Sequence, residues 1–343
     1  MPKARWPGFP KFRELVAQLR DSIIIIPYLG YGTSEKLALC GRVLQDEGFR
    51  PATGSERRWR NLVAFLKRLE SDEIPEARLR ATFRGSSVET ISDSEGYFSV
   101  EFQAAGLPAG WHDIQLQLLD FAAAETGRVL VPASDAEFGV VSDLDDTVIE
   151  SDVTRKLRML LKLALSNAHT RKPFPGVAAF YRALHRGRNP VFYVSKSPHN
   201  LYSPLIEFLQ RQQLPAGPLL LRDYGLRTKE DHKTRAIENI LTTYPALRFI
   251  LIGDSGEQDP EIYTDILSRF PERIRVIYIR SIDRSPARLK AIRKLVEQVA
   301  STGCQLVLAE DSEVAAAHAA AEGLIPAAEL SRVRIDKMAD DKA

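Results

Sequence analysis

Cysteine is scarce in this chain of 343 residues: Cys40 and Cys304 are the only two, and they lie far apart. Their separation excludes a cysteine metal motif and argues against a disulfide framework. The six histidines are scattered and make no zinc motif either. We therefore expect free thiols and a reducing, cytoplasmic location.

Long apolar runs and a charge excess are also missing. The run Ile23-Ile-Ile-Ile26 stops at Pro27, far short of the roughly 20 residues that span a bilayer. Residues 1–12 hold lysine, arginine and proline without an apolar core, so we expect no secretory signal. A net charge of +2, with both signs alternating along the chain, argues against a nucleic-acid partner.

The chain is longer than a single hydrophobic core usually supports, which predicts two domains. Apolar residues recur with a period of two at Leu79, Ala81 and Phe83, and turns separate further short strands up to about residue 119. This pattern predicts a small β-sandwich over residues 1–136, with a helical insertion at 57–69. We expect further strands after this helical insertion. We also expect residues 132–138 to join the two domains.

After residue 147 helices and strands alternate with short links, which predicts a doubly wound parallel sheet of the α/β class. We place this domain at 137–325. A helix at 287–300, a strand at 306–308 and a helix at 312–323 should complete or flank it. Residues 326–343 are assigned to a C-terminal tail.

The first stretch that combines a predicted strand with several acidic residues is Gly139-Val-Val-Ser-Asp-Leu-Asp-Asp-Thr147. A short β-branched run ended by acids is typical of a buried parallel strand. Asp143, Asp145 and Asp146 would then crowd its carboxyl end, where they repel one another unless a cation or a proton holds them. A solvated, Asp-rich turn is the alternative.

Polar or charged residues also lie at or after the ends of three further predicted strands. Ser195 ends the second strand, Lys233 lies on the helix after the third, and Asp254 and Asp259 follow the fourth. In a parallel sheet these ends share one edge, where ligands bind. A carboxylate nucleophile, oxygen ligands for Mg²⁺, a lysine and a serine together suit a phosphorylated substrate.

Three motifs resemble the haloacid dehalogenase superfamily and, within it, the actin-patch type of phosphatidate phosphatase and its bacterial relatives. They are Asp143-Leu-Asp-Asp-Thr-Val148, Tyr193-Val-Ser-Lys-Ser-Pro-His-Asn-Leu-Tyr202 and Leu251-Ile-Gly-Asp-Ser-Gly-Glu-Gln-Asp-Pro-Glu-Ile-Tyr263. The resemblance runs from about residue 24 to 325 and includes Pro27-Tyr-Leu-Gly-Tyr-Gly-Thr33. Lys196 departs from it, because a small or polar residue is expected between the two serines.

The resemblance implies Mg²⁺-dependent hydrolysis of phosphatidate to diacylglycerol and phosphate through an aspartyl phosphate. The expected catalytic residues are Asp143 as nucleophile, Asp145 as acid and base, Ser195 and Lys233. The expected metal ligands are Asp143, Asp145, Asp254 and Asp259, with Asp259 acting more as an orienter of Asp254 than as a direct ligand. The expected substrate contacts are Thr147, Ser195, Lys196, Ser197 and Lys233.

Several alternatives stay open at this stage. Lys229 lies one turn before Lys233 and could replace it, and Ser195 could instead cap the following helix. The substrate could be a soluble phosphomonoester, or the chain could bind phosphatidate without hydrolysing it. The apolar and basic segment 155–166 could pack on the core or make transient contact with a membrane surface.

Overall fold

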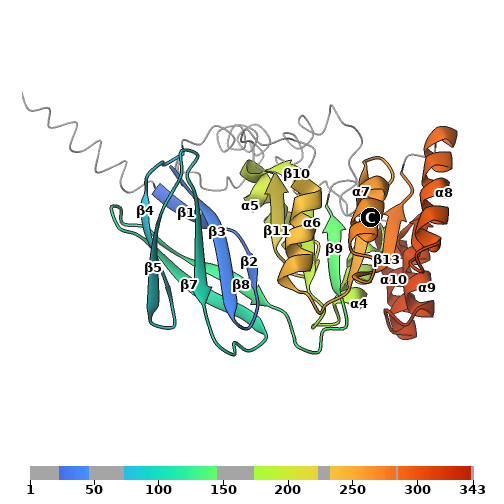
Figure 1. Cartoon of the computed structure of the whole chain (residues 1–343), viewed down its shortest axis with the longest axis horizontal. Helices are drawn as coiled ribbons and strands as arrows, with labels where there is room; N and C mark the ends of the chain where they lie inside the picture. The colour runs from blue at the N-terminus through green and yellow to red at the C-terminus, as the bar shows by residue number, and fades with distance from the viewer. Residues whose placement is uncertain (1–22, 46–72, 145–173, 223–231, 283–284, 341–343) are drawn as a thin grey trace, which may run out of the picture.

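The computed structural model describes residues 23–45, 73–144, 174–222, 232–282 and 285–340. Their strands form two separate sheets, β1–β8 and β9–β14, which lie side by side in Figure 1. The helical insertion predicted at 57–69 and the apolar and basic segment 155–166 lie outside the described residues.

The N-terminal unit is all-β in its described residues. Strand β4 buries Leu79, Ala81 and Phe83 and exposes Arg78 and Arg80, as the period of two predicts. The strands are β1 (Ile23–Pro27), β2 (Gly30–Gly32), β3 (Lys36–Gln45), β4 (Arg78–Phe83), β5 (Ser86–Ile91), β6 (Tyr97–Gln103), β7 (Gly110–Leu118) and β8 (Ala124–Val131).

These strands are hydrogen-bonded into one network in the order β1-β3-β2-β8-β7-β4-β5, with β6 pairing β3. Their inner faces share one aliphatic and aromatic core. The glycine-rich stretch around Tyr31 contains strand β2, which pairs parallel with β8. The division into two packed sheets that defines a β-sandwich stays a prediction.

The second unit is a six-stranded parallel sheet with the order β11-β10-β9-β12-β13-β14. This confirms the predicted α/β architecture with a parallel sheet. The strands are β9 (Gly139–Asp143), β10 (Val191–Pro198), β11 (Leu219–Arg222), β12 (Phe249–Asp254), β13 (Ile274–Arg280) and β14 (Leu306–Ala309).

Helices cover both faces of this sheet. Val140 packs with α4 (Val177–His185), α5 (Tyr202–Arg211) and α9 (Ser312–Ala321), whereas its neighbour Val141 packs with helices on the opposite face. Those opposite helices are α6 (His232–Thr243), α7 (Asp259–Arg269) and α8 (Pro286–Ala300). Both faces are therefore buried, and the strands are continuously apolar as the sequence predicts.

The segment predicted as a C-terminal tail instead contains a helix, α10 (Ala327–Asp340). Val333 of this helix is fully buried against α4 and α9. Its polar side chains also reach the domain, since Asp340 accepts from the Gly176 amide at 2.9 Å and Lys337 donates to Asp311 at 2.5 Å. These tertiary contacts stabilise a helix with a weak apolar stripe. The predicted domain boundaries themselves stay predictions.

Candidate active site

The site lies where the strand order of the parallel sheet reverses, between β9 and β12. Such a switch point opens a crevice at the carboxyl ends of the strands. Strand β9 ends at Asp143 and β12 ends at Asp254, and both carboxylates are buried. The two strands are direct neighbours, with Ser142 opposite Ile252, so the two acids must meet.

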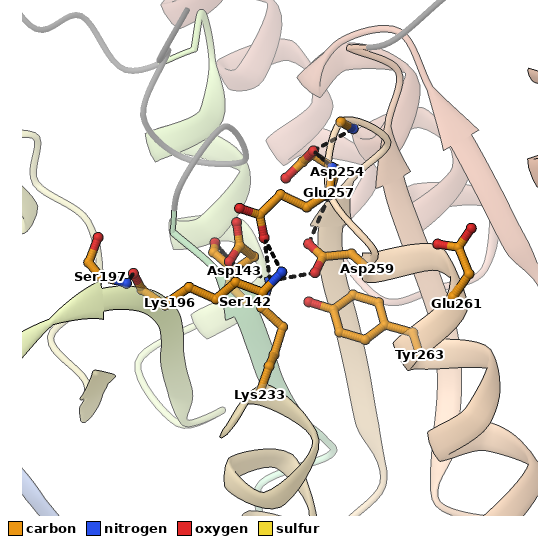
Figure 2. Close-up of polar contacts among 12 residues, drawn as sticks. Ser142, Asp143, Lys196, Ser197, Lys233, Asp254, Glu257, Asp259, Glu261 and Tyr263 are labelled. Atoms are coloured by element: carbon orange, nitrogen blue, oxygen red, sulfur yellow. Dashed lines mark hydrogen bonds and ion pairs between the residues drawn. The ribbon is translucent and has the colours of Figure 1, made fainter. Parts of the chain in front are cut away.

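Asp259, the first residue of α7, completes an acidic triad with Asp143 and Asp254. One carboxylate oxygen from each of the three lies within 4.8 Å of the others. The Asp259 Oδ2 atom accepts a hydrogen bond from the Asp254 amide at 3.2 Å (Figure 2). Gly253 makes the space for this contact, because a Cβ there would collide with the Asp259 side chain.

Lys233 brings a buried positive charge to the triad. Its Nζ atom donates to Asp143 Oδ1 at 2.7 Å and to Asp259 Oδ1 (Figure 2). Burial disfavours the charged ammonium, but Asp143 and Asp259 outweigh burial, so the pKa of Lys233 is held well above its usual value. The lysine therefore stays charged and offsets part of the negative charge of the triad.

Asp254 has one carboxylate oxygen that is bonded and one that is not. Its Oδ1 atom accepts from the amides of Gly256 and Glu257 at 2.6 and 2.9 Å, whereas its buried Oδ2 has no hydrogen-bond partner. Burial, followed by repulsion from Asp259, raises the pKa of Asp254 from 3.8 to about 7. A buried oxygen without a partner beside two other carboxylates suits a hard divalent cation.

Glu257 is a participant that the sequence reasoning missed. Its Oε2 atom lies 3.0 Å from Lys196 Nζ and 3.5 Å from Lys233 Nζ. Burial would raise the pKa of Glu257, but the two lysines lower it, so the carboxylate stays ionised. Two features of the sequence could have pointed to Glu257. It is an acid between Asp254 and Asp259, and its negative charge can compensate the unexpected positive charge of Lys196.

Ser195 reaches the same edge on β10. Val194 pairs with Asp143, so Ser195 lies one residue beyond the end of β9. The side chain is buried, and its Oγ atom accepts a hydrogen bond from the Ser197 amide at 2.9 Å. Neither helix that follows has a side-chain cap, so the alternative of Ser195 as a helix cap is wrong.

Four residues named from the sequence lie outside the described residues, namely Asp145, Asp146, Thr147 and Lys229. The structure thus brings together Asp143, Lys233, Asp254 and Asp259, and places Ser195, Lys196 and Ser197 on the adjacent strand. The catalytic, substrate and metal roles of all these residues stay predictions.

Residues 138–281 match the family model described as phosphatidate phosphatase APP1, catalytic domain. This segment belongs to the APP1 catalytic-domain family. It contains the triad, Lys233 and the Ser195 strand. The match is narrower than the resemblance predicted from the sequence, which extends from about residue 24 to 325.

Two curated relatives are similar to the chain over parts of their length. The Saccharomyces cerevisiae phosphatidate phosphatase APP1 is 34% identical over 155 residues, which are 43% of this chain and 26% of the yeast protein. An uncharacterised Schizosaccharomyces pombe protein is 25% identical over 240 residues, which are 64% of this chain and 40% of that protein. The chain therefore spans well under half of each relative that it matches.

A solved structure of an HAD family hydrolase from Deinococcus radiodurans, with bound phosphate and sodium, aligns at 17% identity. The alignment covers 56% of this chain and 99% of the solved chain, with a TM-score of 0.34. Within the described parts of the chain, no helix is long and apolar enough to cross a bilayer.

Proposed function

We propose that the chain is a Mg²⁺-dependent phosphatase that hydrolyses phosphatidate to diacylglycerol and phosphate. The observation that carries this proposal is the buried cluster of Asp143, Lys233, Asp254 and Asp259 at the switch point, inside the segment matched by the catalytic-domain family. Burying four charges costs several kcal/mol per ion before pairing, so such a cluster is a candidate for chemistry more than for stability.

The donor set fits Mg²⁺. Asp143 and Asp254 would bind it directly, and the partnerless Oδ2 of Asp254 is the oxygen that most needs a cation. Asp259, held by Lys233 and by the Asp254 amide, would orient its neighbours, as the sequence predicts. Bound Mg²⁺ would offset the repulsion between the carboxylate nucleophile and the phosphate.

The proposed chemistry has two steps. A carboxylate oxygen of Asp143 attacks phosphorus, the bond from phosphorus to the ester oxygen breaks, and Asp145 protonates the leaving alkoxide. Water then attacks phosphorus and gives one proton to Asp145, while the bond between phosphorus and the Asp143 oxygen breaks. This second step restores the Asp143 carboxylate and releases phosphate. Lys233 and the hydroxyl of Ser195 would stabilise the transferring phosphoryl group.

Phosphatidate is the proposed substrate because the matched family carries that activity in its description. The experiment is phosphate release from vesicles containing phosphatidate, a short-chain water-soluble phosphatidate and a panel of soluble phosphomonoesters, each with Mg²⁺ and with a chelator. Turnover of phosphatidate that needs Mg²⁺ supports the proposal. Preference for a soluble ester, or phosphatidate binding without phosphate release, would replace it with one of the two alternatives.

Access to a lipid substrate is proposed to use residues 155–166, which combine several leucines with four basic residues. The double substitution Met159→Glu with Leu160→Glu should weaken binding to phosphatidate vesicles and slow their hydrolysis. Activity on the short-chain phosphatidate should survive. Equal loss of both activities would assign the segment to the core.

The cytoplasmic location stays a prediction from the two cysteines.

A further inference from the structure

The motif that carries Ser195 continues into residues that face the N-terminal unit. Tyr202 accepts a hydrogen bond on its hydroxyl from the Leu29 amide at 2.5 Å, and its ring centroid lies 4.3 Å from that of Tyr28. The His199 ring contacts two tyrosines of the same unit, with centroids 5.1 Å from Tyr28 and 5.2 Å from Tyr97. The second half of the motif is thus built against the first sheet.

Arg42 of β3 makes the central contact. Its Nη1 atom donates to Asn200 Oδ1 at 2.7 Å, while Nε donates to the Glu95 carbonyl at 2.8 Å and Nη2 to Glu73 at 2.8 Å. The guanidinium also lies over the Tyr97 ring, 4.6 Å from its centroid. Arg42 is 4% exposed, whereas the other arginines on the described strands of this unit are exposed. A buried guanidinium group whose three nitrogen atoms each donate a hydrogen bond is fixed in one orientation.

The segment between Ser195 and Asn200 is anchored at both ends. At its start, Val194 pairs with Asp143 of β9. Further along, the ladder with β11 is irregular between Val194 and Pro198, so the residues from 195 to 197 leave regular pairing beside the triad. The far end is the 3₁₀ helix η1 (His199–Leu201), which contains Asn200 and is joined to Arg42.

We propose that Arg42 and Asn200 are positioning residues that hold the Ser195 segment in place for the phosphoryl group. The inference rests on the proposed function. A displacement of about 1 Å in a group that positions substrate can cost roughly a hundredfold in rate, so an anchor at Asn200, five residues from Ser195 and bonded to the buried Arg42, has a direct catalytic consequence. The N-terminal unit thereby forms part of the scaffold of the site.

The test uses the full chain and five proteins: wild type, Asn200→Ala, Asn200→Asp, Arg42→Lys and the matched control Arg80→Lys. Arg80 lies on the same unit, in an exposed pair with Glu89. Kinetics with a short-chain phosphatidate give kcat, KM and the inhibition constant of inorganic phosphate. Hydrogen exchange measures the protection of the amides from 195 to 197, independently of turnover.

We expect Asn200→Ala and Arg42→Lys each to raise KM and the phosphate inhibition constant roughly tenfold, and to speed amide exchange by a similar factor. Asn200→Asp should behave like wild type, because a carboxylate accepts the same bond. Arg80→Lys should change nothing. Unchanged kcat/KM and phosphate inhibition in Asn200→Ala and Arg42→Lys, or failure of Asn200→Asp to restore them, would overturn the proposal. If wild type shows no turnover, the proposed function fails, and unchanged exchange in Asn200→Ala would then overturn the inference separately.

Discussion

The two units differ in where their oppositely charged side chains pair, on the surface in the first and in the interior in the second. On the N-terminal sheet, opposite charges pair on outward faces where every side chain is at least 40% exposed, as in Lys36–Glu101, Arg78–Asp120, Arg80–Glu89 and Arg128–Asp113. At the edge of the parallel sheet, Lys233, Asp143 and Asp259 pair with side chains that are no more than 1% exposed. The first sheet keeps its core apolar, and the second places charge inside it.

This difference separates stability from function. An exposed pair is worth about 0–1 kcal/mol and can be lost with little effect. A buried pair must offset the desolvation of both ions, so replacing it with apolar residues is often neutral or stabilising. Charges retained in the interior of the α/β unit are therefore best explained by the chemistry proposed for them. Arg42 is the buried exception in the first sheet, and it donates a hydrogen bond to Asn200 of the α/β unit.

The largest expected effect follows from removing one carboxylate charge in each unit. Asp143→Asn should lower turnover by on the order of a thousandfold or more, because it removes the proposed nucleophile while nearly preserving volume. Asp113→Asn, in an exposed pair on β7, is the control and should leave turnover unchanged. Steady-state phosphate release by Asp143→Asn within tenfold of wild type would contradict the assignment.

A matched lysine pair compares stability. Lys233→Met should lower the free energy of unfolding by about 3–5 kcal/mol in chelator, because it leaves Asp143 and Asp259 buried without their cation. Lys36→Met breaks an exposed pair and should cost at most about 1 kcal/mol. Denaturant unfolding measures both values, and equal costs would show that the buried cluster is not electrostatically coupled.

The raised pKa of Asp254 makes Mg²⁺ binding depend on pH. In the metal-free fold this acid keeps its proton up to about pH 7, whereas at its ordinary pKa of 3.8 it would lose the proton at a much lower pH. Metal-free stability should therefore fall as pH rises from about 4 to about 7. Below pH 7, Mg²⁺ must displace the proton, so affinity should rise about tenfold per pH unit and then level off. Calorimetry from pH 5 to 8 measures this, and a flat affinity would rule out Asp254 as a ligand.

The smallest effect comes from adding one methyl group in each unit. Gly253→Ala would push against the Asp259 side chain, whereas Gly127→Ala would push against the aliphatic side chain of Leu39. Both should cost about 1–3 kcal/mol of stability through overpacking. Only Gly253→Ala should also weaken Mg²⁺ binding and turnover, by roughly tenfold. Unchanged turnover in Gly253→Ala would show that the position of Asp259 is not critical.

Local patterns were enough to predict much of the second unit. The alternation of helical and strand patterns predicted the parallel sheet, and it placed Lys233 on a helix, which is α6. Strand ends then located Asp143, Ser195 and Asp254 on one edge, since parallel strands leave no other arrangement. Helix α10 was not predicted, because its apolar stripe is weak and its stability comes from contacts with α4 and α9.

The sequence by itself determined the residue types at the strand ends and the edge on which they meet, because strand direction and period are local properties. Only the tertiary structure decided that Glu257 bridges Lys196 and Lys233, and that Arg42 reaches Asn200 across 158 residues. Such contacts depend on how separate elements pack against one another. A charged side chain looks the same in the sequence whether it is later left in water or buried among partners.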